Sequence, residues 1–398
     1  MLLTGLPAAI PVLVLLSAAE PPEPRFRAVE LDAKVQIGYG VTTADVDGDG
    51  RPDILLVDKN EIVWYRNPSW EKFIMAEKLT QADHVCIAAQ DLGGDGKAEV
   101  AVGAGWDPGD TVGSGAVFYL AAPRDRTQRW EPVPLPHEPT VHRMRWLKGA
   151  DGKHVLVVVP LHGRGNRNGE GAGVKVLAYR MPDNPRDAWT LETVDENMHL
   201  THNFDPVHWT AGAGPELVLA GKEGLFQLLR QGGTWTRRQL GGNPPGEASF
   251  PGAGEVRAGR LPGGGRLLAT VEPMHGTNVA IYIPTAGSAA NALWRRSVID
   301  DTLVDGHAVA CGDLLGTGSD QVVVGWRAMN RPQTKVGIKL YTPLDPQGNH
   351  WRTTLVDDNT MACEDLCLAD LDGDGKLDIV AAGRATHNLK VYYNQVAR

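Results

Sequence analysis

The chain has 398 residues, of which 42% are hydrophobic and 22% charged, and this balance excludes a wholly disordered protein. Its 47 glycines and 27 prolines are typical of many short strands joined by turns. The net charge is −9 and no Lys/Arg-rich run occurs, so we expect no nucleic-acid partner.

The N-terminal segment, residues 1–19, has the pattern of a secretory signal peptide. An apolar run ends in Ser17-Ala18-Ala19 before Glu20, which is a small-residue cleavage site. The run is too short to span a membrane comfortably, and no other segment of the sequence qualifies. We therefore expect cleavage near Ala19, a secreted or periplasmic protein without a membrane span, and one mature domain over 20–398.

A repeated segment recurs at intervals of about fifty residues along the chain. The strongest copies are TTADVDGDGRPDILLV at 42–57 and CLADLDGDGKLDIVAA at 367–382. Weaker or degraded copies occupy 87–102, 142–159, 207–221, 255–271 and 308–325. Between them lies an aromatic residue followed five positions later by an aliphatic one, as in Trp70 and Met75, and Phe26 and Leu31 begin the series.

Seven such units, built only of short strands, predict an all-β fold, a seven-bladed β-propeller. The N-terminal strand at 26–33 precedes the first unit and the last unit ends the chain, so the N-terminal strand must complete the last blade. This closure removes a free sheet edge. The first turns of the seven units are expected to begin at Asp45, Asp91, Trp146, His208, Arg260, Asp313 and Asp370.

Two of these turns have the alternating spacing of oxygen ligands that calcium loops use. The ligands expected are Asp45, Asp47, Asp49, the carbonyl of Arg51 and Asp53 in the first turn, and Asp370, Asp372, Asp374, the carbonyl of Lys376 and Asp378 in the last. We expect Ca²⁺ or Mg²⁺ here in a structural role. The alternative is a set of β-turns in which Asp side chains accept backbone N–H groups. The repeats resemble the FG-GAP and VCBS repeat family, which implies the propeller fold and no particular function.

A second set of residues precedes the turns by four to seven positions. In a propeller the first strand of each blade lines the central channel, so these residues should converge on one mouth of it: Tyr39, His84, His142, His202, Glu255, His307 and Glu364. The chain has 12 histidines, and four of them follow the phase of the repeat. This pattern favours metal binding or acid–base chemistry, whereas the alternative for any one of them is a hydrogen-bonded channel residue.

Further polar and aromatic residues follow strands of several blades and suit a sugar, which offers CH faces and hydroxyls. With Tyr39 and Glu255, the candidates for substrate binding are Arg145, His162, Arg164, Asn166, His275, Trp326, Arg327, Arg384 and His387. The alternative for the tryptophan is packing between blades. No G-x-S-x-G, HExxH or dinucleotide fingerprint occurs, which disfavours serine hydrolases, zincins and NAD-dependent enzymes.

Longer strings, among them HVCIAAQDL, EPTVHRMRW, GHAVACGDLLG and ACEDLCLADLDGDGKLDIVAAGRATHN, resemble the propeller domain of aldos-2-ulose dehydratases. The resemblance implies dehydration of a keto-sugar of the 1,5-anhydrofructose or glucosone type. In such a reaction we expect His142 and His202 as base and acid. His84, His307 and Glu364 would be ligands or orienting groups. Arg143, or a divalent metal held by the central histidines, would polarise the carbonyl.

Two other functions remain open at this point. One is a non-catalytic, calcium-stabilised propeller for carbohydrate binding or adhesion, in which the channel histidines would be dispensable. The other is a lyase or hydrolase that acts on an oxidised glycoside or oligosaccharide with the same residues. In each case the partner is a small molecule or an oligosaccharide.

Overall fold

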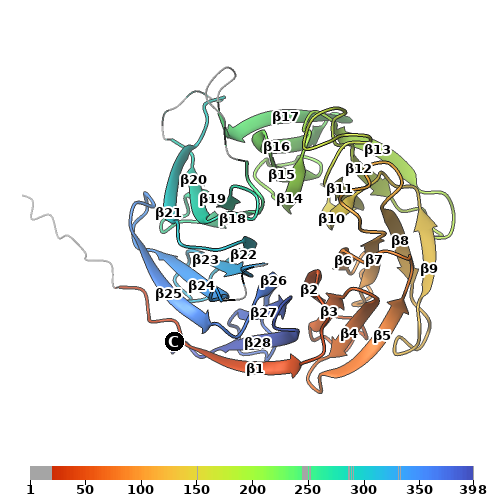
Figure 1. Ribbon diagram of the computed structural model, residues 1–398, viewed down its shortest axis with the longest axis horizontal. Helices are drawn as coiled ribbons and strands as arrows, with labels where there is room; N and C mark the ends of the chain where they lie inside the picture. Colours follow the sequence, from red (N-terminus) through yellow and green to blue (C-terminus); the bar gives the residue numbers. More distant parts are fainter. Residues whose placement is uncertain are drawn as a thin grey trace, which may run out of the picture.

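The computed structural model describes residues 20–397 except 150, 244–249, 251, 286, 288, 290, 330 and 332. The predicted signal peptide, residues 1–19, lies outside the described residues. Seven four-stranded antiparallel sheets surround a central axis (Figure 1), which confirms the predicted all-β, seven-bladed propeller. The described residues form strands and turns, and they contain no helix long and apolar enough to cross a membrane.

In six blades the strands run from the channel outward in chain order, and in the last blade the N-terminal strand β1 takes the outermost place. The innermost strands are β2 (Gly40–Ala44), β6 (Cys86–Gln90), β10 (Val141–Lys148), β14 (Thr201–Pro206), β18 (Val256–Arg260), β22 (Gly306–Gly312) and β26 (Cys363–Ala369). The second strands are β3 (Asp53–Val57), β7 (Glu99–Ala104), β11 (His154–Pro160), β15 (Glu216–Gly221), β19 (Arg266–Glu272), β23 (Gln321–Trp326) and β27 (Asp378–Gly383). The third strands are β4 (Glu61–Arg66), β8 (Ala116–Ala121), β12 (Val176–Arg180), β16 (Gly224–Gln231), β20 (Asn278–Ile283), β24 (Gly337–Pro343) and β28 (Asn388–Asn394). The outermost strands are β5 (Glu71–Glu77), β9 (Glu131–Leu135), β13 (Thr190–Asp195), β17 (Thr234–Gly241), β21 (Arg295–Asp300), β25 (Trp351–Asp358) and β1 (Phe26–Asp32).

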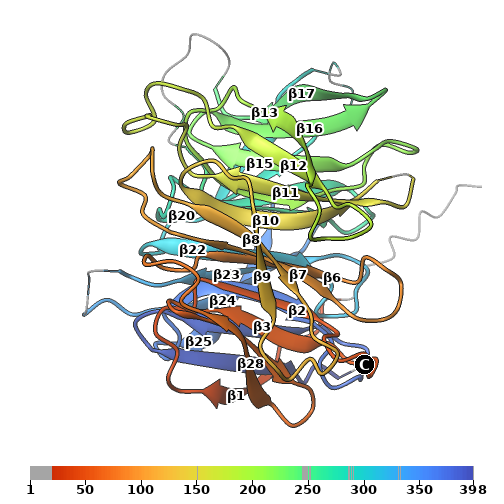
Figure 2. The same ribbon diagram turned by 90° about the vertical axis from the view of Figure 1, so that its right-hand side faces the viewer.

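The ring is closed by pairing of the two ends of the chain. Strand β1 lies antiparallel to β28, with Phe26 opposite Asn394 and Glu30 opposite Lys390. Figures 1 and 2 show the two strands side by side in the last blade. The predicted closure is therefore confirmed, and β28 gains a partner instead of presenting an open edge.

The repeated aromatic residue lies at or just before the outermost strand of each blade. Trp130, Trp189 and Trp294 are 3%, 5% and 8% exposed, although they belong to the outermost layer. Their rings pack into the apolar layers of the protein. They anchor the periphery of the blades by burying large aromatic surfaces.

Each of the first and last Asp-rich turns joins the two innermost strands of its own blade and is hydrogen-bonded to the next blade. The second residue of the first turn, Val46, is buried; its N–H donates to Asp53 and its carbonyl accepts from Arg126 of the next blade. In the last turn, the N–H of Leu371 donates to Asp378, and the carbonyl of Leu371 accepts from the side chain of Asn67 in the first blade.

A polar side chain of one blade thus completes the hydrogen bonding of a buried turn in the blade before it. Asn394 extends the pattern, because its side chain donates to the carbonyl of Leu314 in the sixth blade.

The turn of the third blade differs from its prediction. Strand β10 continues to Lys148, so Trp146 lies within the strand and not at the start of the turn. The degraded repeat lacks the acidic residues that mark this boundary in other blades.

The Asn67→Ala variant tests the role of these joints in stability. Asn67 Nδ2 donates to the carbonyl of Leu371 at 2.7 Å, and the side chain is 2% exposed. Its removal leaves a buried carbonyl without that donor, so we expect the free energy of unfolding to fall by about 1–3 kcal/mol in chemical denaturation. Ser69→Ala is the control, because it removes a hydroxyl that donates to the carbonyl of Arg66 at an exposed site. Equal stability of both variants and the wild type would contradict the account.

Candidate functional site

Four of the innermost strands have a β-bulge near their first residues, where they carry one residue more than the strand they pair with. The pairing register shifts at these points in β10, β14, β22 and β26, whereas β2, β6 and β18 pair with their neighbours without a shift. The residues at the shifts include His142, His202, His307 and Glu364. A β-bulge re-aims a side chain out of the normal alternation of a strand. The bulges therefore explain why these four positions differ from their equivalents in the other blades.

Two of the bulge histidines donate to the backbone of the next blade. His142 Nδ1 lies 2.9 Å from the carbonyl oxygen of His202, and His307 Nδ1 is hydrogen-bonded to the carbonyl oxygen of Glu364. In each case the acceptor occupies the equivalent bulge position. A carbonyl oxygen only accepts, so Nδ1 carries the proton and Nε2 keeps a lone pair.

His202 connects a buried carboxylate to an accessible histidine. Its Nδ1 lies 3.2 Å from Glu255 Oε1, and its Nε2 lies 2.7 Å from Nε2 of His275. The carboxylate favours a proton on Nδ1 of His202, so Nε2 of His202 accepts from Nε2–H of His275. His275 then keeps its lone pair on Nδ1. It follows β19 in a turn with a positive φ of 52°, and its side chain is exposed.

Three of the imidazoles are placed to share one ligand. His202, His275 and His307 each offer a ring nitrogen, and these atoms lie within 4.8 Å of one another. The ring of His275 lies 4.6 Å from that of His202 and 4.8 Å from that of His307. Three imidazoles, of which His202 and His307 have Nδ1 next to a carboxylate or a carbonyl, are a donor set that fits a divalent transition metal such as Zn²⁺.

His142 contacts the same cluster but has both ring nitrogens engaged. Its ring lies 4.6 Å from that of His202 and stacks on Trp106 at 4.8 Å. Arg143 Nη1 donates to His142 Nε2 at 3.1 Å, which occupies the remaining lone pair. In this arrangement His142 cannot accept a proton from a substrate unless Arg143 moves.

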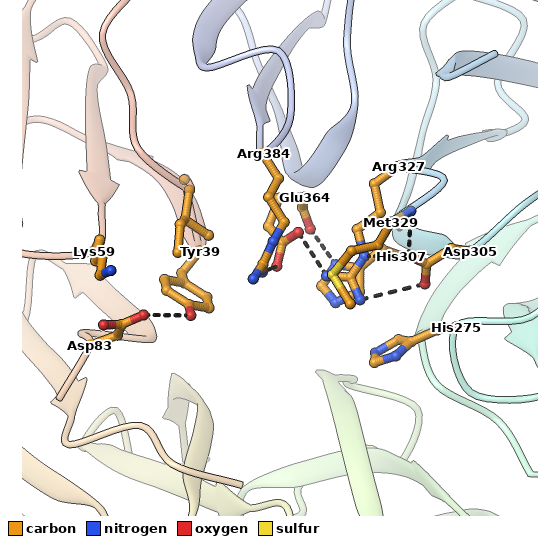
Figure 3. Close-up of polar contacts among 12 residues, drawn as sticks. Tyr39, Lys59, Asp83, His275, Asp305, His307, Arg327, Met329, Glu364 and Arg384 are labelled. Atoms are coloured by element: carbon orange, nitrogen blue, oxygen red, sulfur yellow. Dashed lines mark hydrogen bonds and ion pairs between the residues drawn. The ribbon is translucent and has the colours of Figure 1, made fainter. Parts of the chain in front are cut away.

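An alternating series of acidic and basic side chains lies beside the histidines (Figure 3). Arg327 is bound between Asp305 at 3.0 Å and Glu364 at 2.7 Å, and it is only 4% exposed. The second oxygen of Glu364 accepts from Arg384 at 3.1 Å. Arg384 lies over the ring of Tyr39, at 5.5 Å from its centroid.

Tyr39 extends this series toward the second blade. Its hydroxyl donates to Asp83 at 2.8 Å, as Figure 3 shows. Burial, together with this acceptor, raises the pKa of Tyr39, so the phenol keeps its proton. The channel mouth thus combines imidazoles, guanidinium groups and a phenol within one polar surface.

Burial keeps the histidines neutral. Burial and then the charge of Arg143 lower the pKa of His142 well below 6.5, and burial and then Arg327 do the same for His307. Burial also lowers the pKa of His202, although Glu255 partly offsets it. His275 is exposed as a residue, but desolvation by the protein atoms around its ring, followed by the charge of His202, lowers its pKa. Burial raises the pKa of Glu255, but the hydrogen bond from His202 and the charge of Arg257 outweigh it, and the result is about 2. Neutral imidazoles next to an ionised carboxylate follow at neutral pH.

Several predicted residues do not reach this cluster. His84 lies between loops of the first two blades, where its Nε2 accepts from the N–H of Leu79 at 3.1 Å. The side chain of Asn166 is buried and donates to two backbone carbonyls, and Arg164 pairs with Glu138 near the surface. His162 is half-buried.

The other predicted residues outside the cluster lie in the core, at a loop or deeper in the channel. The indole of Trp326 is 7% exposed, packs in the core and donates to the carbonyl of Lys335. His387 Nδ1 lies 3.0 Å from the carbonyl oxygen of Val35. Arg145 lies deeper in the channel and donates to Asn203 at 2.8 Å. The roles predicted for these residues remain predictions.

Two acidic residues of the mouth were not identified from the sequence. Asp305 orients Arg327, and Asp83 accepts from Tyr39. Each comes one or two residues before a residue of the predicted series, Asp305 before His307 and Asp83 before His84. Their place next to the channel positions is the signal that could have identified them.

The Asp-rich turns lie at the opposite ends of the innermost strands from the histidines. Asp45, Asp47 and Asp53 bring carboxylate oxygens within 4.8 Å of one another, and so do Asp370, Asp372 and Asp374. Both turns also hold themselves together, since the carboxylates of Asp45 and Asp370 accept N–H groups of following glycines. The two readings of these turns, ion loop and β-turn, are therefore compatible with each other.

Comparison with family models supports the propeller and names a relative of its central part. Residues 114–285 match the β-propeller domain of aldos-2-ulose dehydratase, and residues 40–102 match an FG-GAP-like repeat. The first match contains His142, His202, Glu255 and His275. The second contains the first Asp-rich turn.

A comparison with individual proteins agrees with the match to the family models. The chain is 27% identical over 337 residues to an aldos-2-ulose dehydratase of Phanerodontia chrysosporium, a match that covers 78% of this chain and 36% of that protein. The chain therefore spans about a third of the length of the curated relative it matches.

Solved structures are similar in fold alone. A chain of the mitotic checkpoint complex has a TM-score of 0.54 at 12% identity over 99% of this chain and 98% of its own. A chain from the structure of BBS1N in complex with ARL6DN has the same TM-score at 13% identity over 95% and 98%. From the repeats, the ring and these matches together, the chain is a seven-bladed propeller with FG-GAP-like repeats, similar to the β-propeller domain of aldos-2-ulose dehydratase.

Proposed function

We propose that the channel mouth dehydrates a keto-sugar by removing the proton α to its carbonyl and expelling a β-hydroxyl as water. The observation that carries this proposal is the convergence of neutral histidines, one of them accessible, with an ionised Glu255 and a half-exposed arginine. Such a reaction needs a base that is neutral at the working pH and a positive group for the developing enolate. Similarity to a sugar dehydratase supports the same class of reaction.

His275 is the residue best placed to transfer the proton. Its Nδ1 takes the α-proton, and the electrons of the broken C–H bond move onto the carbonyl oxygen as an enolate. The enolate then forms the C=C bond and expels the β-oxygen, and His275 returns the proton so that water leaves. His202 accepts from Nε2–H of His275, and Glu255 stabilises the positive charge behind it.

Arg384 is the group of this surface that can stabilise the enolate oxygen. One of its nitrogens donates to Glu364, and its side chain remains 29% exposed. Arg327 has three of its N–H groups committed to Asp305 and Glu364, so it holds Glu364 in place and does not face the substrate. Glu364 in turn orients Arg384 toward the channel.

A divalent metal is a second possible use of the same nitrogen atoms. His202, His275 and His307 would hold it, and when bound it would polarise the substrate carbonyl as a Lewis acid. A histidine that coordinates a metal is not free to transfer the proton as proposed above, so the two uses exclude each other. A chelator separates the two uses, since proton transfer by free imidazole persists after metal removal.

We also propose Ca²⁺ or Mg²⁺ as a structural ion in the first and last Asp-rich turns, supported by the gathered carboxylates.

The apolar N-terminal segment supports export of the mature protein. The substrate class we propose is a small keto-sugar of the 1,5-anhydrofructose or glucosone type. A binding propeller, or a lyase or hydrolase of oxidised glycosides, is the competing outcome of the experiment below.

The His275→Gln variant tests the assignment of the base. Purified protein is incubated with 1,5-anhydrofructose or glucosone, with and without EDTA, and the rise of ultraviolet enone absorbance is followed. We expect kcat to fall about 100-fold or more in His275→Gln, since general base catalysis contributes 10²–10⁴-fold. Glu255→Gln should lower kcat less, because it acts through His202. His350→Gln, at an exposed histidine remote from the channel, is the control and should retain wild-type kcat.

Three other outcomes of this assay have distinct meanings. Full activity of a folded His275→Gln protein would remove the assignment of His275. Loss of wild-type activity in EDTA, restored by Zn²⁺, would assign the three histidines to a metal. Absence of enone from a folded wild-type protein would contradict the dehydratase proposal and favour a binding propeller or an enzyme of glycosides.

The pH dependence of stability tests whether the histidines are neutral in the folded protein. Burial lowers the pKa of His142, His202 and His307 in the folded state, while the unfolded chain protonates near 6.5. Above about pH 6.5 neither state binds these protons, so stability is complete. Below it the unfolded state binds more protons, and each such histidine lowers the free energy of unfolding by up to about 1.4 kcal/mol per pH unit.

The measurement is urea unfolding of EDTA-treated protein from pH 8 to pH 5. His202→Gln should show a shallower decrease below pH 6.5 than the wild type, because it lacks one of the contributing groups. His350→Gln again serves as the control. A wild-type stability that is unchanged from pH 8 to pH 5 would show that the cluster accepts protons as readily as the unfolded chain does.

A further inference from the structure

A polar cavity continues the channel beyond the histidines, toward the face with the Asp-rich turns. Its volume is about 210 Å³, and its walls are formed mainly by β2, β6 and β10. The polar groups that line it include Thr42, Gln90, Arg143, Arg145 and Asp365. None of the mouth histidines lines it, but Tyr39 does, and Arg143 of the lining donates to His142, so the cavity adjoins the mouth.

Two arginines of β10 enter this cavity with most of their donors unused. Arg143 and Arg145 are two residues apart on one strand, so their side chains share its channel face. Arg143 is 7% exposed, and its Nη1 alone makes side-chain hydrogen bonds, both to His142. Arg145 likewise uses only Nη1, for Asn203 and the carbonyl of Phe204. Among the described residues neither arginine has a carboxylate within 4.0 Å.

The lining of the cavity holds more arginine than carboxylate, although the charges of the wider region balance. Asp365 is the one carboxylate among the lining residues, against the two arginines. Outside the lining, the carboxylates of Glu255 and Asp205 lie 3.6 Å and 4.0 Å from Arg257, which balances one of their two charges. The unused N–H donors of the two arginines, and not an excess of positive charge, therefore favour a ligand that accepts hydrogen bonds.

The lining also favours a ligand that donates a hydrogen bond, because one carboxylate oxygen of Asp365 has no donor within the described part of the chain. Asp365 Oδ2 accepts from the backbone N–H of Val41 at 2.9 Å, while Oδ1 has no hydrogen-bond partner among the described residues. An ionised carboxylate only accepts. A ligand that contacts the two arginines with a carboxylate and Asp365 with a hydroxyl would satisfy both sides of the cavity.

We infer that this cavity binds a short hydroxycarboxylic acid as a monoanion, with Arg143 and Arg145 on its carboxylate and Asp365 on a hydroxyl. The proposal concerns the channel beyond the mouth and does not depend on the dehydration reaction. Guanidinium groups suit this ligand because they present parallel N–H donors to a carboxylate. The small volume limits the ligand to a few carbon atoms beyond its carboxylate.

Titration calorimetry with D-glycerate tests the inference at constant ionic strength. Propionate, which lacks the hydroxyls, and glycerol, which lacks the charge, are the matched probes. We expect glycerate to bind the wild type at least tenfold more tightly than either. Arg145→Met keeps the apolar stem and should weaken glycerate at least tenfold, while Arg238→Met, at an exposed arginine of β17, should leave it unchanged.

Asp365→Asn keeps the shape of the side chain and should weaken glycerate while leaving propionate binding unchanged or stronger. His275→Gln distinguishes this cavity from the mouth, because glycerate should bind this variant as it binds the wild type. Loss of glycerate binding in His275→Gln, with no effect of Arg145→Met, would place the acid at the mouth and overturn the inference. Equal affinity for glycerate, propionate and glycerol would also overturn it. If Arg145→Met does not fold, Thr42→Val and Asp365→Asn carry the same comparison.

Discussion

Hydrogen bonds from one blade to the equivalent position of the next determine where the channel histidines point. His142 donates to the backbone of His202, and His307 donates to the backbone of Glu364. Each of these residues lies at a bulge, which adds one residue and redirects the side chain. Because donor and acceptor belong to different blades, the direction of these side chains depends on the packing of neighbouring blades. The pairing of β1 with β28 completes the last blade, which carries Glu364.

The two ends of the innermost strands carry different polar groups, which suit different ligands. At one end of the strands, neutral imidazoles gather where burial disfavours their protonation. At the other end, carboxylates gather in turns that neighbouring blades hold through Asn67, Arg126 and Asn394. The first end is therefore suited to proton transfer or to a transition metal, and the second to a hard cation such as Ca²⁺. Between them lies the arginine-lined cavity, which adjoins the first end because Arg143 donates to His142.

The repeats and their aromatic markers were sufficient to predict the blades, their number and the closing strand. Periodicity also placed His142, His202, His307 and Glu364 in one zone, and the structure brings them together. It failed for His84, because the second blade lacks the bulge and its innermost strand begins only at Cys86. A bulge of one residue leaves almost no trace in a pattern of apolar and polar positions, so the sequence could not separate blades that have it from blades that do not.

Other parts of the site depend on side-chain direction, which spacing does not determine. His275 comes from a turn of the fifth blade and still joins His202, and Arg145 follows the bulge but enters the cavity beyond it.

The central claim is that the mouth histidines remove the proton α to a carbonyl. The most direct test is proton NMR of 1,5-anhydrofructose in D₂O with the wild-type protein. We expect loss of the α-proton signal with growth of a vinyl signal, at a rate that falls in His275→Gln. An unchanged sugar spectrum, from folded protein that binds the sugar, would contradict it.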